Sequence, residues 1–187
     1  MGTLTGENAI VTGASRGIGW AIAERVARDG ASVVENCANS PDQAKELVAV
    51  MEAGGGKAIA IQADIARIRY LRRIFPDTLP HFGQMDILVN NDAVSFNTLA
   101  PVVEVTENEF DVVFGLNARG AFFAMQEAAR RLPDCSQIIN ISTGVAKTRM
   151  LEDLFALCPP EMKTILIQRT LMGRLGQPVD VADAAAS

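Results

Sequence analysis

The sequence predicts an α/β domain with three layers, in which helices cover both faces of a doubly wound parallel sheet. Short apolar segments alternate four times with segments of helical pattern, and short connections join them. Crossovers between parallel strands are right-handed, so this alternation distributes helices over both faces of one sheet. The expected strands are almost continuously apolar rather than alternating, which is typical of strands that are buried on both faces.

Turn residues and caps set the expected boundaries of these elements. Ser40 suits the N-cap of a helix and Pro41 its first position, and the glycines at 54–56 end that helix. Pro76 and Pro80 are expected to interrupt the next helix, because proline lacks the N–H that a helix interior needs. The expected strands span residues 8–11, 31–37, 57–61, 86–89 and 137–141, and the other expected helices span 20–28, 66–82 and 107–132, the last with kinks near Gly115 and Gly120.

Length and composition indicate one globular domain. The chain has 187 residues, of which 49% are hydrophobic and 21% charged, so it is long enough for a proper core. A net charge of −5 without a basic run argues against nucleic acid as a partner. No apolar run approaches membrane-spanning length and no secretory signal is visible, so we expect a cytoplasmic protein with no membrane partner. The three cysteines lack metal-like spacing, which predicts reduced thiols and no metal site.

The stretch from Ile10 to Gly19 runs from an apolar strand through a glycine-rich turn into a helix. Gly13 suits the tight turn, Gly17 lets the backbone approach a phosphate, and Gly19 allows the helix to pack closely on the strand. The unpaired N–H groups and the dipole of the helix N-terminus favour an anion there. The spacing G-x-x-x-G-x-G differs from the commonest dinucleotide motif, so a glycine turn without a ligand stays open as the alternative.

Further motifs follow the glycine turn in a fixed order. They are Ala63-Asp64-Ile65, then Asp86-Ile87-Leu88-Val89-Asn90-Asn91, then Leu116-Asn117, and then Ile139-Asn140-Ile141-Ser142. Together they resemble the classical short-chain dehydrogenase/reductase family, nearly continuously from Leu4 to Val145. Residues 173–182 are similar to the segment that follows the substrate loop of that family. The resemblance implies one Rossmann-like domain over residues 1–187, incomplete in its C-terminal half, in a homodimer or homotetramer.

The resemblance also assigns a dinucleotide to the carboxyl end of the sheet. Asp64 would hold the edge of the adenine through its side chain and Ile65 through its backbone, although Asp64 could instead be an ordinary turn former. Asn90 would lie beside the adenosine ribose, and the pair Asn90-Asn91 would also stabilise the sheet. The residues that would cradle the pyrophosphate are Gly13, Gly17, Ile18 and Gly19, with Ser15 in the same turn.

Charge at the end of the second strand favours NADP(H) over NAD(H). A carboxylate at this position would bind the ribose diol of NAD and repel the extra phosphate of NADP, but the residue here is Cys37. Asn39 and Ser40 can donate hydrogen bonds to that phosphate, and Arg16 in the glycine turn supplies a positive charge. The alternative for Arg16 is a solvent-exposed turn residue, and Glu35 on the same strand complicates the assignment.

Two catalytic positions of the family are retained in the sequence. The resemblance makes Asn117 the residue that positions a water in a proton relay, and Ser142 the donor to the substrate oxygen. The family also uses a Tyr-x-x-x-Lys pair after the fifth strand, in which the lysine lowers the pKa of the tyrosine. The single tyrosine here is Tyr70, on the third expected helix, and Lys147 has no tyrosine partner.

Compared with the family pattern, we expect one gap between Val145 and Ala146 and another after Ser187. Either this sequence omits residues of a complete enzyme, which is our working hypothesis, or the protein is a shortened relative. Asp92 and Ala93 also replace the usual Ala-Gly, and either change could hinder the nicotinamide.

Two functions follow from the retained and missing residues. The first is an NADP(H)-dependent oxidoreductase that moves a hydride between the nicotinamide and a small carbonyl or secondary alcohol. The second is a catalytically inactive dinucleotide-binding protein with a sensing or scaffolding role. A substrate pocket is expected between residues 95–103 and 150–157, where Phe96, Leu99, Leu151 and Phe155 are either lining or ordinary packing residues.

Overall fold

The computed structural model describes residues 2–96, 101–159 and 161–187, and it contains one five-stranded sheet. The strands are β1 (Asn8–Thr12), β2 (Ser32–Cys37), β3 (Lys57–Gln62), β4 (Ile87–Asn90) and β5 (Gln137–Asn140). Their order across the sheet is β3-β2-β1-β4-β5, and every neighbouring pair is parallel. The strand order therefore reverses between β1 and β4, and in open sheets of this kind ligands bind at the carboxyl ends beside such a reversal.

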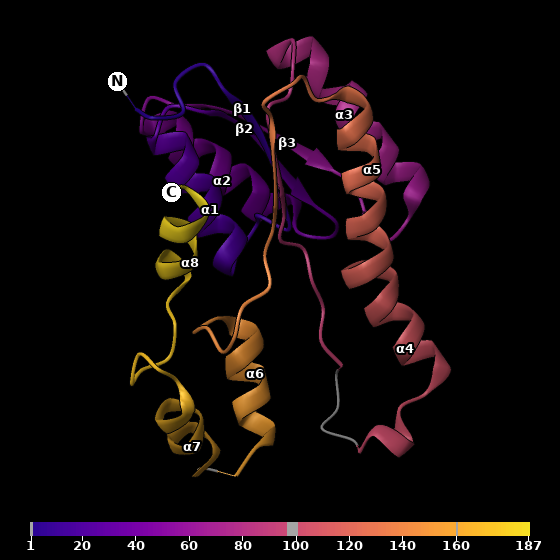
Figure 1. Cartoon of the computed structure of the whole chain (residues 1–187), viewed down its shortest axis with the longest axis vertical. Coiled ribbons are helices and arrows are strands. Elements are labelled where there is room, and N and C mark those ends of the chain that lie inside the picture. Colours follow the sequence, from indigo (N-terminus) through magenta and orange to yellow (C-terminus); the bar gives the residue numbers. More distant parts are fainter. Residues whose placement is uncertain (1, 97–100, 160) are drawn as a thin grey trace.

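Helices cover both faces of the sheet, as the alternating pattern predicts (Figure 1). On one face, Ile22 and Leu47 pack with Val11 and Val33 in one core cluster. On the other face, Ile10 packs with residues from the later helices in a second cluster. The helices are α1 (Gly17–Arg28), α2 (Pro41–Ala53), α3 (Ile68–Phe82), α4 (Glu107–Phe114), α5 (Ala121–Arg131), α6 (Arg149–Leu157), α7 (Glu161–Arg169) and α8 (Pro178–Ala185).

Helix α1 begins three residues earlier than the hydrophobic pattern predicts, at Gly17 rather than Trp20. The apolar periodicity starts only at Trp20, but Trp20 N already donates to Arg16 O (3.3 Å), which closes the first turn. Gly17, Ile18 and Gly19 are therefore the first turn of the helix, where N–H groups have no partner within the helix.

The expected interruption of α3 by its two prolines is wrong. The helix is continuous from Ile68 to Phe82 and contains both Pro76 and Pro80. Leu71, Ile74 and Phe75 lie on its buried face at helical spacing, and their packing outweighs the cost of about 3 kcal/mol that an interior proline carries.

Kinks are expected near Gly115 and Gly120, and the structure has a change of helix type at these two glycines. A π-helical segment, η2 (Gly115–Gly120), connects α4 to α5, so the expected helix 107–132 consists of three parts. A short 3₁₀ helix, η1 (Val102–Glu104), precedes α4. Helix α4 itself starts with a capping box between Thr106 and Glu109.

The C-terminal part returns to the sheet through α8. Helices α6 and α7 lie beyond one end of the sheet, while α8 packs against α1 (Figure 1). Ala146 and Gly176 form an isolated parallel bridge, in which Lys147 N donates to Gly176 O (2.7 Å). Among the described residues, no helix has both the length and the apolar character needed to cross a membrane.

Candidate functional site

The glycine turn lies at the carboxyl end of β1, beside the reversal of strand order. Gly13 and Gly17 have φ values of 63° and 61°, in the left-handed region that favours glycine. A Cβ on Gly13 would lie 2.7 Å from the Cα of Asp92, so the segment after β4 packs directly on the turn. Only glycine fits at position 13, for its backbone conformation and for this close approach.

A hydrogen-bond network fixes the turn to the end of β4. The Thr12 hydroxyl donates to Val89 O (3.3 Å) and accepts from the backbone N–H groups of Asn91 (3.0 Å) and Asp92 (3.1 Å). The Asn91 amide donates to Thr12 O (2.9 Å) and Gly13 O (3.2 Å). These bonds confirm the expected structural role of Asn91, and the hydroxyl of Thr12, which sequence reasoning missed, is their centre.

The first turn of α1 fits an anionic group. Arg16 is its N-cap residue and gives no side-chain hydrogen bond to the helix, and the first turn holds no acidic residue. The N–H groups and the positive end of the dipole are therefore available to an anion. Among the described residues, a Cβ on Gly17 would meet only Thr148 within 4 Å, at 3.5 Å, so the approach to the backbone is open. Buried Ser15 and half-buried Ile18 complete the turn, and Gly19 packs against Gly13 O.

The end of β2 carries the groups expected to choose between the two dinucleotides. Cys37 is 2% exposed, whereas Arg16 and Asn39 are exposed and Ser40 is half-buried. Ser40 occupies the N-cap of α2 as predicted, but its side chain makes no capping hydrogen bond. Glu35 is fully buried, so its carboxylate is not presented to a ribose diol.

The residues expected around the adenosine are engaged in local structure. Asp64 accepts from Ala66 N (3.0 Å) and forms an ion pair with Arg67 (3.4 Å), which are the contacts of a turn former. Ile65 is 1% exposed. Asn90 donates to the Asn140 side chain (2.9 Å) and ties β4 to β5, while its own Oδ1 is buried without a partner among the described residues.

The two expected catalytic residues lie on different elements. Asn117 is in the π-helical segment, and its side chain pairs with the backbone of Val94, accepting at 2.9 Å and donating at 2.7 Å. Its amide thus positions the segment after β4. Ser142 lies just past β5 and is exposed. Tyr70, the single tyrosine, is on α3, which packs against α5 and β2.

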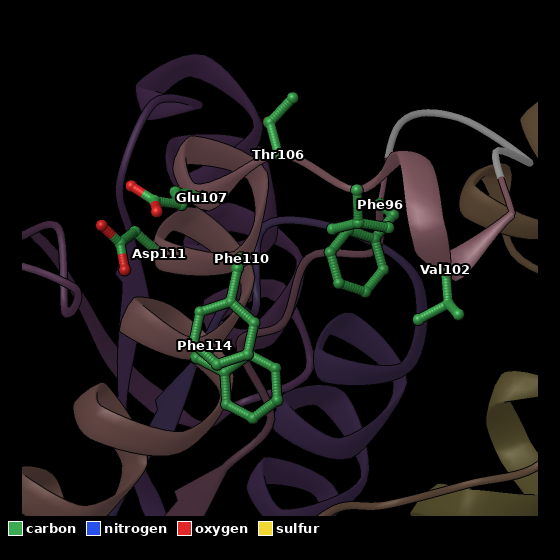
Figure 2. A pocket seen from close by; sticks show the side chains of 8 residues that line it. Phe96, Val102, Thr106, Glu107, Phe110, Asp111 and Phe114 are labelled. Carbon is green, nitrogen blue, oxygen red and sulfur yellow. The ribbon is translucent and has the colours of Figure 1, made fainter.

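A hollow of about 610 Å³ opens beside α4. Figure 2 shows the stacked rings of Phe110 and Phe114, with Phe96 and Val102 on one side of them. Phe96 and Val102 belong to the segment expected to line the substrate pocket, but neither Asn117 nor Ser142 lines this hollow. The remaining pocket candidates divide: Leu151 is buried and packs, Phe155 is half-buried, and Leu99 lies outside the described residues.

Burial perturbs two carboxyl groups beside the turn. Burial, with a smaller contribution from the charge of Asp92, raises the pKa of Glu35 to about 7. Burial also raises the pKa of Asp92 to about 6, with the charge of Asp64 in the same direction and that of Arg16 and the N–H of Ala93 against it. The sequence signal for Glu35 is an acid directly after the two valines at the centre of an expected strand.

Comparisons with known proteins agree with this geometry. The family model described as short chain dehydrogenase matches residues 7–152. Elsinochrome reductase 1 of Elsinoe fawcettii is 48% identical over 147 residues, which are 77% of this chain and 54% of that protein. The chain thus spans about half the length of the curated relatives that it matches.

Solved structures share the fold over almost the whole chain. A short chain dehydrogenase from Burkholderia cenocepacia J2315 in complex with NADP superposes with a TM-score of 0.86 at 28% identity, covering 98% of this chain and 90% of that one. The angucycline C-6 ketoreductase LanV with bound NADP gives 0.88 at 29% identity, covering 99% and 89%. With the glycine turn, the parallel sheet and the family match, the chain belongs to the short-chain dehydrogenase family.

Proposed function

We propose that the protein is an oxidoreductase that uses NADP(H) and acts on a carbonyl compound or secondary alcohol. The observation that carries this proposal is the uncapped, acid-free first turn of α1, which opens at Gly17 beside the reversal of strand order. NADP bound to two structures of the same fold supports the choice of dinucleotide. The reductase named among the relatives supports the reaction type.

The residues of this chain would hold the dinucleotide by its phosphates. The N–H groups of Gly17, Ile18 and Gly19 would hold the pyrophosphate, and Arg16 would hold the additional phosphate of NADP(H). Buried Cys37 brings no negative charge to that phosphate, because burial raises the pKa of its thiol, with Glu35 and Asp92 adding to the shift. The bound nicotinamide supplies or accepts a hydride.

On the substrate side, Ser142 would donate a hydrogen bond to the reacting oxygen. Its hydroxyl is exposed at the carboxyl end of β5, the same end of the sheet as the glycine turn. Asn117 acts as a positioning residue, because its amide holds the backbone of Val94, shortly after β4, through two hydrogen bonds.

A second function is supported by the position of the single tyrosine. Tyr70 lies on α3 and not after β5, and this favours a dinucleotide-binding protein that does not turn over a substrate. Titration of NADPH fluorescence, together with NADPH oxidation in the presence of aromatic and aliphatic ketones, separates the two. Binding with turnover supports the oxidoreductase, and binding without turnover supports the second function. Lack of NADPH binding contradicts both.

A further inference from the structure

Strand β2 contains a carboxylate, that of Glu35, which is shielded from solvent. Glu35 is fully buried, and neither of its carboxylate oxygens has a hydrogen-bond partner among the described residues. Side chains alternate along a strand, so Glu35 shares its face with Val33 and Cys37. It lies opposite Val11 in the register of β1, one residue before Thr12 and the glycine turn. A buried, unpaired charge is costly, so this position favours the protonated acid.

A second carboxylate lies against the turn itself. The Oδ1 atom of Asp92 is 2.8 Å from the position that a Cβ on Gly13 would occupy, and its backbone N–H is held by Thr12. The turn also touches β2, because Ala14 N donates to Asn36 O (3.2 Å). Glu35 and Asp92 therefore border the same turn from the two strands that flank β1.

The charged surroundings of this pair are mixed. Asp92 and the thiol of Cys37 face Glu35, and Asp64 and Arg16 face Asp92. Burial is the largest cause of the raised pKa of both carboxyl groups, and the ionised form of Asp92 also opposes that of Glu35. Arg16 is exposed and is the one cation of this group, and it faces the proposed phosphate as well. An anion bound at the turn would therefore add to the repulsion of the pair.

We propose that Glu35 and Asp92 make dinucleotide binding proton-coupled: the site takes up a proton when the anionic dinucleotide binds, and affinity falls as the pair ionises. The inference rests on the proposed binding of a dinucleotide at this turn and adds its regulation by pH. It follows from linkage, because a phosphate near a carboxylate favours the protonated acid, and the proton must then favour the phosphate equally.

Isothermal titration calorimetry with NAD⁺ and NADP⁺ tests the proposal. Each titration is run at pH 6.5 and pH 8 in two buffers that differ in ionisation enthalpy, so that proton uptake is measured directly. NAD⁺ is included because the extra phosphate of NADP⁺ titrates near pH 6 by itself. We expect proton uptake by the wild-type protein near neutral pH and a dissociation constant that rises roughly three- to tenfold to pH 8 with both dinucleotides.

Variants identify the groups that cause the pH dependence of dinucleotide binding. Asp92→Asn and Glu35→Gln should each reduce the rise of the dissociation constant between pH 6.5 and pH 8 and tighten binding at pH 8. Glu35→Val is a second, apolar replacement in case the buried amide of Glu35→Gln impairs folding. Asp77→Asn, an exposed carboxylate on α3, is the matched control and should retain the wild-type dependence. If only one of the two variants removes the pH dependence of the dissociation constant, a single carboxylate causes it. That result would contradict the proposal that Glu35 and Asp92 act as a pair.

The outcomes also separate the proposal from the proposed function. Binding of both dinucleotides without proton uptake, or an unchanged rise in the Asp92→Asn/Glu35→Gln double variant, overturns the proton coupling and leaves the dinucleotide site intact. Failure to bind either dinucleotide at both pH values overturns the site and the coupling with it.

Discussion

Glu35 shows how a single buried acid affects the stability of the whole protein. Its pKa is raised from the ordinary 4.5 to about 7 by burial, so the unfolded chain releases this proton at lower pH than the folded one. The contribution of this group is fully favourable below pH 4.5, and it is lost as pH rises from 4.5 to 7. Because the side chain is fully buried, solvent does not screen the effect.

Glu35→Gln should therefore stabilise the protein at pH 8 more than at pH 5, with a difference of about 3 kcal/mol in the free energy of unfolding. Urea unfolding of both proteins at the two pH values measures it. Other titrating groups cancel when wild type and variant are compared at the same pH. An equal effect at pH 5 and pH 8 would show that Glu35 is ionised in the folded protein.

Arg16→Gln tests whether a single residue makes the site prefer NADP⁺ over NAD⁺. A charge-assisted hydrogen bond contributes about 1.5–3 kcal/mol, so affinity for NADP⁺ should fall roughly 10- to 100-fold while affinity for NAD⁺ changes little. Arg28→Gln, at the other end of α1, is the control. An equal loss for NADP⁺ and NAD⁺ would mean that Arg16 binds the pyrophosphate.

At the scale of elements, one buried carboxylate joins two helices. Glu127 on α5 is 2% exposed and forms ion pairs with Arg72 of α3 (3.2 Å), with Arg130 (2.9 Å) and with Arg131. All three arginines are partly exposed, so water can solvate them if the carboxylate is removed. The buried carboxylate of Glu127, in contrast, depends on the arginines for its compensating positive charge.

Glu127→Ala should reduce the free energy of unfolding by about 1–3 kcal/mol, because it removes all three charged contacts and leaves a buried gap. Arg72→Ala should cost less than about 1 kcal/mol, since Glu127 keeps two partners. Chemical denaturation compares the two variants. A larger loss for Arg72→Ala would show that the link between α3 and α5, and not the burial of the carboxylate, dominates.

The sequence predicts most element positions, and the exceptions have physical causes. Apolar runs locate β1, β2 and β4, because burial on both faces leaves little choice of residue. The edge strands β3 and β5 are largely exposed or half-buried, so the expected burial on both faces is wrong for them. Gly115 and Gly120, where kinks are expected, are the first and last residues of a π-helical segment that the sequence does not predict. The hydrophobic pattern does not show the start of α1, because the helix begins within the glycine turn, and tertiary packing carries α3 through Pro76 and Pro80.

At the scale of the molecule, the parallel sheet with helices on both faces follows from the alternating pattern, whereas the strand order and the side-chain contacts around the turn do not. The hydrogen-bond partners of Thr12, which are Asn91 and Asp92, lie 79 and 80 positions away in the sequence. No local sequence pattern therefore indicates these hydrogen bonds. The same holds for Asn117, whose side-chain amide forms two hydrogen bonds with the backbone of Val94. The motifs indicate candidate binding residues, whereas the contacts that hold those residues in place are visible only in the fold.

The proposed homodimer or homotetramer is also a property of the whole molecule. Phe110, Phe114 and Phe122 on α4 and α5 are each about half exposed, and apolar surface of this kind favours association. Light scattering after size-exclusion chromatography should give two or four times the chain mass of 20.0 kDa. A monomer mass at micromolar concentration would contradict this proposal.

The central claim, that the turn at Gly17 binds a dinucleotide, is tested most directly by titrating NADPH fluorescence with the wild type and two matched variants. Asn and Asp both tolerate the left-handed backbone of Gly17, but Asp places a negative charge among the first-turn N–H groups. We expect binding by the wild type, weaker binding by Gly17→Asn, and a further loss of at least about tenfold for Gly17→Asp, equivalent to about 1.4 kcal/mol. Equal binding by all three proteins, or none by the wild type, would contradict the claim.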